Sequence, residues 1–418
     1  MRSFSHFHCC LLVIAFGVLS SVAVAQHGAS ENFSDTPALP SKEAAEKDAK
    51  LSPEQIGRKK AIERCLSIYF TRQVDADVLR PWSIMHGLIG FGDQTLILTQ
   101  GKRVNAVQYL CANGIGDDRR LLYAIDGKLR TNVGRGYQGH EGQLLAMLAQ
   151  ANVSPDLPIT VDGKTYTVAD LIRYEMESCK SQTELTFKLL GLSHYLDSDA
   201  AWTAQDGQAW NFARLLQEEL NSKIDETTAC GGTHRLMAVS RAIKNRKEQG
   251  KAFDGNWKSA QKYVDDFREF AFGFQGPDGS FSSQWFRTKE FSGDQNRRLY
   301  TTGHVLEWLV YDAETNELLD PRISKAVDFV VNLMLNAPGY DLDVGPRGHA
   351  LHALRIYEKR VFGASNHQQL MGSKFARQIE IQNRQIRQAT RQQQSSPTDS
   401  DSVPISPFRR RGILGFRR

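Results

Sequence analysis

Beyond residue 25 the sequence has no apolar run long enough to cross a membrane as a helix, and it contains few cysteines. It has no Cys-x-x-Cys pair, so zinc-ribbon and thioredoxin-like redox sites are excluded. It also has no His-Glu-x-x-His segment, the compact zinc signature of many metallopeptidases. Any metal or catalytic site must therefore combine residues that are far apart in the sequence.

The first 25 residues have the pattern of a secretory signal rather than of a folded element. Arg2 precedes an apolar run over residues 9–19, and small residues then lead to Ala25. This pattern predicts a signal peptide cleaved near Ala25, and hence a secreted or periplasmic protein. An uncleaved anchor is the alternative. Residues 26–50 are small and polar and are expected to form a flexible leader.

Cysteine usage agrees with export without proving disulfides. The cysteines that remain after the signal segment are Cys65, Cys111, Cys179 and Cys230. An oxidising compartment permits two disulfides, but four cysteines allow three pairings. Because all four lie in apolar helical contexts, four buried free thiols are an equally good alternative.

The formal charge of +5 is concentrated at the carboxyl end. Residues 374–418 hold ten basic and three acidic residues, and residues 364–418 are rich in Gln, Ser and Arg. This composition predicts a disordered basic tail that contacts anionic surfaces, or else a solvated extension without a partner. The preceding body has no basic face with interleaved aromatic residues, so nucleic acid is not an expected partner.

Five histidines recur at matching positions along the chain. They are His86, His140, His234, His304 and His349, and all but His140 read His-x-apolar-x-x-apolar. A further segment has Glu184 in this place, and the successive separations are then 54, 44, 50, 70 and 45 residues. A period of about 45 residues with one helix pair per period predicts a repeat architecture.

Hydrophobic periodicity and turn residues predict twelve helices within residues 51–363. They are expected near 53–71, 81–91, 101–112, 138–151, 166–179, 181–196, 207–221, 231–248, 256–273, 301–312, 321–336 and 347–360. Amphipathic helices alternate with helices that are apolar around most of their circumference, which predicts an inner and an outer ring. Two small β-hairpins are expected at 121–133 and 159–167, each around an Asp-Gly pair.

The segment between Gln275 and Phe281, with Gly279 in its middle, is similar to the Gln-x-x-x-Gly-x-aromatic repeat of the terpene cyclase and protein prenyltransferase superfamily. The resemblance implies an all-α fold over residues 51–363, an α/α6 toroid of six helical hairpins. In that superfamily the glycine begins a tight turn and the glutamine caps the preceding outer helix. Other α/α toroids, including glycosidases and polysaccharide lyases, remain alternatives.

The sequence lacks the catalytic motifs of that superfamily, so the resemblance does not imply its reactions. The Asp-x-Asp-Asp of the cyclases that protonate their substrate is absent. Prenyltransferases hold zinc with an Asp-x-Cys pair and a histidine at an inner-helix start. His234 or His304 resembles that histidine, but Cys230 has no aspartate two residues before it.

The recurring residues would meet at one mouth of the central funnel, where the starts of the inner helices converge. Helix amino termini disfavour the imidazolium, so neutral rings are expected. The expected ligand-binding residues are His86, His140, Glu141, Glu184 and His349. A divalent metal such as zinc is a candidate cofactor, with candidate ligands His140, His234 and His304. Histidines that only pack and hydrogen-bond in a repeated turn are the alternative.

A long insertion over residues 285–300 carries aromatic and arginine residues between two predicted helices. Trp285 and Arg297 are expected to bind ligand, the arginine by receiving a carboxylate or uronic acid. The candidate catalytic residues are His304, Tyr300, Arg298 and His234. Tyrosine, histidine and arginine together resemble the set that toroid polysaccharide lyases use for proton abstraction. A loop latched to the rim by ion pairs is the alternative.

These features predict an exported toroid protein that binds an extended or anionic ligand in its central funnel. As an enzyme it would be an acid/base lyase or hydrolase acting on a polysaccharide or another envelope polymer. A non-catalytic toroid that binds a ligand or protein, and an enzyme resembling terpene cyclases or prenyltransferases, are the alternatives.

Overall fold

The computed structural model describes residues 51–72, 74–225, 228–337 and 342–363. The predicted signal peptide, flexible leader and basic tail lie outside these residues. The described part is mainly α-helical, as expected, with a few small strand pairs. None of its helices has the length and apolar composition needed to span a lipid bilayer.

Twelve α-helices occur in the described residues, the number that the sequence predicts. They are α2 (Pro53–Phe70), α3 (Pro81–Phe91), α4 (Ala106–Cys111), α5 (Gln143–Gln150), α6 (Val168–Glu177), α7 (Thr186–Tyr195), α8 (Phe212–Asn221), α9 (Thr233–Glu248), α10 (Gly255–Gly273), α11 (Gln295–Asp312), α12 (Pro321–Asn336) and α13 (Val344–Val361). Where local signals are strong the boundaries agree closely. Ser52, for example, caps α2 in a capping box with Gln55, and Pro53 follows it.

The strands form one three-stranded sheet and four two-stranded pairs in the described residues. The two predicted hairpins are present, as β6 (Leu122–Ile125) with β7 (Lys128–Thr131) and β8 (Pro158–Val161) with β9 (Lys164–Thr167). The sequence analysis missed the sheet of β1 (Val74–Asp75), β2 (Leu96–Thr99) and β3 (Lys102–Asn105). It also missed β4 (Ile115–Gly116) with β5 (Arg119–Arg120), and β10 (Ala201–Thr203) with β11 (Ala209–Asn211).

Five helices begin five or six residues from their expected starts, namely α4, α5, α7, α8 and α11. For α4 and α11 the reason is identifiable. Helix α4 begins at Ala106 rather than near 101, because residues 102–105 pair with β2 and Asn105 then caps the helix. Helix α11 begins at Gln295 rather than near 301, because the Asp294 side chain accepts a hydrogen bond from the Asn296 amide. His304 therefore lies in the middle of α11 and not at its start.

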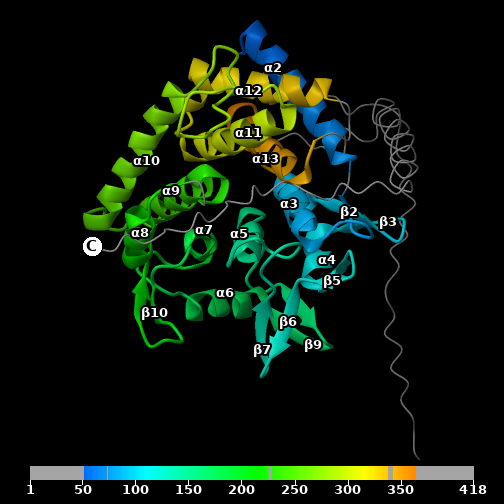
Figure 1. Ribbon diagram of the computed structural model, residues 1–418, viewed down its shortest axis with the longest axis vertical. Coiled ribbons are helices and arrows are strands. Elements are labelled where there is room, and N and C mark those ends of the chain that lie inside the picture. Colours follow the sequence, from blue (N-terminus) through cyan, green and yellow to red (C-terminus); the bar gives the residue numbers. More distant parts are fainter. Residues whose placement is uncertain (1–50, 73, 226–227, 338–341, 364–418) are drawn as a thin grey trace, which may run out of the picture. The chain divides into compact units, whose positions relative to one another are not determined.

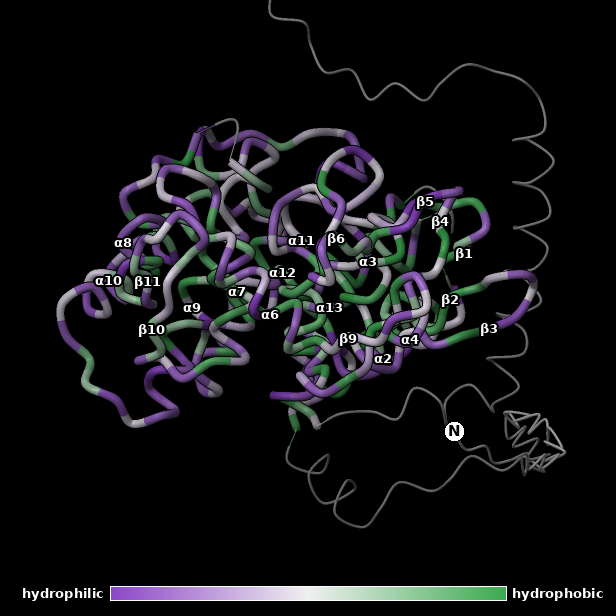
Figure 2. Tube along the Cα trace, turned by 90° about the horizontal axis from the view of Figure 1, so that it is seen from below, coloured by the Kyte–Doolittle hydropathy of each residue, from purple (hydrophilic) through white to green (hydrophobic). Residues whose placement is uncertain are grey.

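The six helices that carry or follow the recurring residues pack in a closed order. Helix α3 contacts α5, and contacts then run through α7, α9, α11 and α13, which returns to α3 (Figure 1). These helices are buried around most of their circumference; in α11 every residue from Thr301 to Val310 is buried. The helix α10, by contrast, buries only Trp257, Ala260, Val264 and Ala271. Helix α8 likewise buries only Phe212, Leu215, Leu216 and Glu219, and Figure 2 shows hydrophobic and hydrophilic residues interspersed along the trace.

The Gln275–Phe281 segment forms the tight turn that its sequence predicts. Gly279 has a φ of +90°, and the Gln275 side-chain amide donates to the Gly279 carbonyl at 3.0 Å and to the Arg322 carbonyl at 2.8 Å. Phe281 is buried, and its amide donates to the Thr302 hydroxyl at 3.1 Å. The segment thereby ties the end of α10 to both α12 and α11.

Gly279→Ala tests this turn. An added Cβ would lie 2.3 Å from the Lys325 carbonyl oxygen, in a backbone conformation that L-residues rarely adopt. We expect the free energy of unfolding to fall by roughly 2–4 kcal/mol in urea denaturation. Gly57→Ala is the control, because Gly57 is helical with open space around it and should gain about 0.5–1 kcal/mol. Equal free energies of unfolding for the two variants would show that the turn does not require glycine at position 279.

Candidate metal centre and cavity

Four imidazole rings from four different helices meet in the interior. His86, His234, His304 and His349 lie on α3, α9, α11 and α13, and each is between 2 and 6% exposed. The His304 and His349 ring centroids are 3.8 Å apart, and His234 lies 5.2 Å from His304 and 5.0 Å from His349. His86 completes the cluster at 5.8 Å from His349. We call these four residues the histidine cluster.

Backbone carbonyls set the tautomer of two of these rings. The Nδ1 of His86 lies 2.7 Å from the Trp82 carbonyl oxygen, and the Nδ1 of His304 lies 2.7 Å from that of Tyr300. Because a carbonyl oxygen can only accept, each Nδ1 carries the hydrogen and donates. The Nε2 of each ring is then an unprotonated nitrogen with a free lone pair. Second-sphere hydrogen bonds of this kind orient the histidines of metal sites.

A buried carboxylate plays the same part for His349. Glu307 accepts from the Nδ1 of His349 at 2.7 Å and from the Nδ1 of His352 at 2.6 Å. Burial by itself raises the pKa of Glu307, but the two imidazoles outweigh it and hold the pKa well below its usual range. The Nε2 of His349 is buried and has no hydrogen-bond partner among the described residues.

Three rings of the histidine cluster, those of His86, His234 and His304, are uncharged. Burial lowers the pKa of His86 to about 3 and, with the neighbouring His349, lowers that of His304 well below its usual range. His234 is affected in the same direction and by the same two causes. Neutral imidazoles can accept a proton or bind a metal ion, whereas imidazolium ions can do neither.

A cysteine adds a sulfur donor to two of the histidines. The Sγ of Cys230 and ring nitrogens of His234 and His304 all lie within 4.8 Å of one another. Cys230 has a φ of +46°, a left-handed conformation that is uncommon for residues other than glycine, asparagine and aspartate. Gly231 and Gly232 follow with φ values of +62° and +89°, and the chain then enters α9. This sharp turn brings the sulfur back beside His234.

The donor set fits a thiophilic divalent ion such as zinc. One sulfur and two imidazole nitrogens are ordinary zinc ligands, and three protein ligands leave one tetrahedral position open. Burial raises the pKa of Cys230 to about 12, so without a cation the side chain is a neutral thiol. The Tyr300 hydroxyl lies 3.2 Å from the sulfur and can donate to the thiolate that a metal ion would create.

A cavity of about 410 Å³ lies directly beside this donor set. Cys230, Gly231 and Tyr300 form part of its wall, so the sulfur belongs both to the cluster and to the cavity. Trp285 packs against Gly231, where an added Cβ would lie 2.3 Å from the indole Cγ. The indole ring also meets His304 edge to face, at 5.8 Å between centroids. The metal candidates and the cavity thus share one wall.

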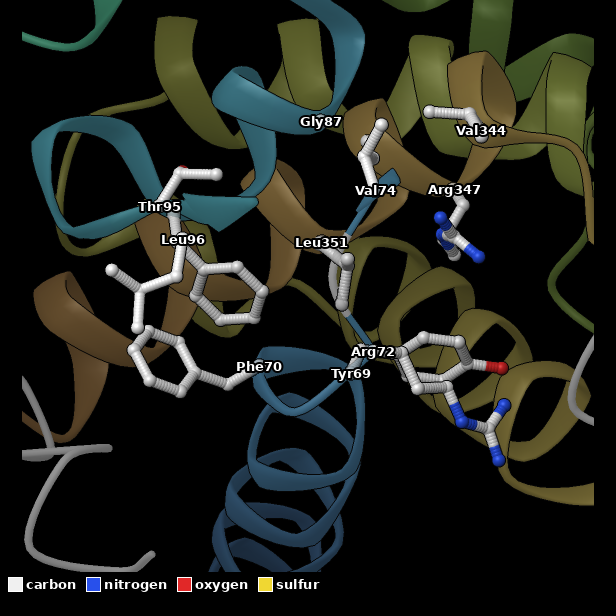
Figure 3. A pocket seen from close by; sticks show the side chains of 12 residues that line it. Tyr69, Phe70, Arg72, Val74, Gly87, Thr95, Leu96, Val344, Arg347 and Leu351 are labelled. Carbon is white, nitrogen blue, oxygen red and sulfur yellow. The ribbon is translucent and has the colours of Figure 1, made fainter. Parts of the chain in front are cut away.

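A second cavity, between α2, α3 and α13, is only about 30 Å³ in volume. That space suits about one water molecule. Figure 3 shows Arg72 and Arg347 on one side of it and Phe70, Thr95 and Leu96 on the other. It is too small for an organic ligand.

The predicted residues of the 285–300 insertion divide into two groups. Tyr300 and Trp285 lie against His304, with Tyr300 at 4.8 Å and Trp285 at 5.8 Å between ring centroids. The guanidinium of Arg298 instead pairs with Asp278 and donates to the Ser280 hydroxyl. Arg298 therefore latches the start of α11 to the turn that precedes the insertion.

His140 and Glu184 form a pair at the edge of the histidine cluster. The Nδ1 of His140 lies 2.6 Å from a Glu184 carboxylate oxygen, and both side chains are about one-third exposed, at 32% and 38%. Phe187 connects the pair to the cluster, with its ring 4.9 Å from His140 and 5.0 Å from His234. His140, a predicted metal ligand, lies outside the three-residue donor set.

Glu141 belongs to a separate polar group around a fully buried lysine. The Nζ of Lys188 lies 2.9 Å from Glu141 and 3.5 Å from Glu175, and it donates to the carbonyl and hydroxyl oxygens of Ser178. Glu175 is completely buried, whereas the Glu141 side chain is 53% exposed. Glu141 is thus held by Lys188 of α7 and is not a member of the Cys230, His234 and His304 donor set.

No model of a known protein family matches the chain, and comparisons with curated proteins and with solved structures likewise found no match.

Cys230 is the site residue that sequence reasoning missed. All four cysteines in the described residues carry free thiols, and of these only Cys230 is partly exposed. The available signal was the spacing Cys230-Gly-Gly-Thr-His234, which is compatible with two ligands on one turn. Because no aspartate lies two residues before Cys230, this spacing does not match the Asp-x-Cys pair of prenyltransferases.

The Glu175 carboxyl makes stability depend on pH. Burial raises its pKa from 4.5 to about 7 despite the attraction of Lys188. Because the folded pKa exceeds the unfolded value, its stabilising contribution is present below about pH 4.5 and is lost as the pH rises through about 7. Glu175→Gln stays neutral, so its stability relative to wild type should rise by about 1–3 kcal/mol from pH ~4.5 to ~8 in urea denaturation.

Glu269→Gln removes an exposed carboxylate and serves as the control for this measurement. Parallel pH profiles for Glu175→Gln and wild type would show that Glu175 is ionised throughout.

Proposed function

We propose that the protein is an exported, metal-dependent hydrolase whose metal ion is held by Cys230, His234 and His304. The single observation that carries this proposal is the convergence of one sulfur and two imidazoles within 4.8 Å, from two segments of the chain. Two further features support it. The Nδ1 of His304 is already hydrogen-bonded to a carbonyl, and a ligand-sized cavity adjoins the sulfur.

We also propose that the twelve helices form an α/α toroid. Support comes from the closed order of contacts among α3, α5, α7, α9, α11 and α13, and from the more exposed helices that pack against them. In such a toroid the inner helices would bring residues from distant repeats to one central region. This is how Cys230, His234 and His304 could form a single site although the sequence separates them by up to 74 positions.

A zinc ion with three protein ligands acts as a Lewis acid and makes bound water a nucleophile near neutral pH. In hydrolysis the hydroxyl of water joins the electrophilic atom of the substrate, and the remaining proton leaves with the departing group. Tyr300 would donate a hydrogen bond to the Cys230 sulfur and moderate its charge. The buried, unpartnered Nε2 of His349 would supply a hydrogen-bond acceptor close to His304. An anionic envelope polymer or polysaccharide remains the proposed substrate class.

A non-catalytic binding protein is the second candidate, and the depth of the histidine cluster favours it. Rings that are 2 to 6% exposed could serve as a packed, hydrogen-bonded interior with a purely structural metal ion. The two candidates differ in one respect. A structural site would keep its metal and show no turnover.

Metal analysis of the purified full-length chain tests the proposal. Wild type should contain about one equivalent of zinc, and Cys230→Ser and His234→Ala should each lose most of it because a ligand is missing. Cobalt substitution should give a thiolate-to-metal charge-transfer band that Cys230→Ser lacks. Polyanionic polysaccharides screened with the metal-loaded protein should be cleaved, and Cys230→Ser should fail to cleave them.

His86→Gln is the matched control, because His86 is equally buried in the histidine cluster but lies outside the donor set. It should retain the metal. Wild type that binds no divalent metal, or a His86 variant that loses metal as completely as His234→Ala, would refute the assigned ligands.

A further inference from the structure

The cavity beside Cys230 has walls of a distinctive composition. Five of its twelve lining residues carry aromatic rings, namely Phe267, Phe270, Trp285, Phe286 and Tyr300. The Phe267 and Phe286 rings meet edge to face at 5.3 Å between centroids. Phe270, although apolar, is 46% exposed at the cavity. Such a surface favours a flat apolar ring, which can stack on or meet these rings edge to face.

Arg297 lines this cavity and is fixed by one hydrogen bond from its Nε, which leaves its two terminal amino groups for a ligand. The Nε of Arg297 donates to the Ser283 carbonyl at 2.8 Å. Its guanidinium carbon lies 5.5 Å from the Trp285 ring centroid and 5.6 Å from that of Tyr300. Its two terminal amino groups make no hydrogen bond to the described residues. A guanidinium with both terminal groups available matches the geometry of a carboxylate or phosphate.

The charge of the cavity points the same way. Its ionisable wall residues are Arg287, Arg297 and Asp225, apart from the cysteine and tyrosine. Two cations against one carboxylate favour an anionic ligand. The volume of about 410 Å³ lies within the usual range for small-molecule sites, roughly 300–1,000 Å³.

We propose that this cavity binds an apolar, flat ring that carries an oxyanion, and that Arg297 is the residue that binds the oxyanion. The oxyanion is a carboxylate or a phosphate. Arg297 and the Cys230 sulfur border the same cavity, so the ligand lies between the guanidinium and the donor set. The inference goes beyond the proposed function: this ring-bearing anion is a ligand of the cavity and distinct from the polymer substrate, and its binding does not require the metal.

Calorimetric titration of the full-length chain with four probes tests this. The probes are 2-naphthoate, 2-naphthyl phosphate, the neutral 2-naphthalenemethanol and trigalacturonate. Wild type should bind at least one naphthyl anion about tenfold or more tightly than the neutral alcohol. The preferred anion distinguishes a carboxylate from a phosphate ligand. Trigalacturonate, whose hydroxyls find few partners on aromatic walls, should bind more weakly.

Arg297→Gln should weaken the naphthyl anions roughly tenfold to hundredfold and leave the neutral alcohol unchanged. Phe270→Ala should weaken all three naphthyl probes alike, because it removes apolar wall and no charge. Arg173→Gln, which removes an exposed arginine on α6, is the control and should match wild type.

Three results would overturn the inference: no binding of either naphthyl anion, equal binding of the neutral alcohol, or an Arg297 variant that binds as wild type does. Tighter binding of trigalacturonate than of 2-naphthoate would also reject an apolar ring. Metal content is measured in the same samples. Arg297-dependent binding by a protein without metal would preserve this inference and refute the proposed function. A protein that holds the metal but shows no Arg297-dependent binding would refute this inference and preserve the proposed function.

Discussion

Three of the buried imidazoles, those of His86, His234 and His304, stay uncharged in the interior that they share, and the centre of this protein is built around that constraint. Burying an imidazolium without a partner is costly, and several together would repel one another. The chain meets the constraint by giving the Nδ1 hydrogens of His86 and His304 to carbonyl oxygens of their own helices. The hydrogen of His349 goes to Glu307. The rings of His86 and His304 then each keep an unprotonated nitrogen.

This arrangement explains why the interior suits a cation. Lone pairs gathered in a space with little water have few partners, and the Nε2 of His349 has none among the residues described. A thiol at Cys230 that burial keeps protonated would become a ligand only if a metal ion replaced its proton. The backbone turn at Cys230, Gly231 and Gly232 places that sulfur, and Trp285 packs directly on the turn. Substitutions at Trp285 would therefore change the position of the Cys230 sulfur.

Much of the fold could be predicted because its signals are local. Caps, turn residues and apolar periodicity act over a few residues, so helices such as α2, α9 and α12 were located to within two residues at either end. The Asp-Gly hairpins were predictable for the same reason, since a two-residue turn with positive φ favours those residues. The hairpin of β2 and β3 turns instead at Gln100 and Gly101, a weaker signal. It displaced the expected start of α4.

The sequence by itself determined the number of helices, their alternating character and the recurrence of histidine along the chain, because each depends on neighbouring residues. Only the tertiary structure decided which of those histidines lie in contact and which other residue contributes to the same site. Cys230 is a neighbour of His304 because of a left-handed turn, and Arg298, a candidate catalytic residue by sequence, pairs with Asp278. Contacts between residues so far apart depend on how whole helices pack, and no local pattern encodes them.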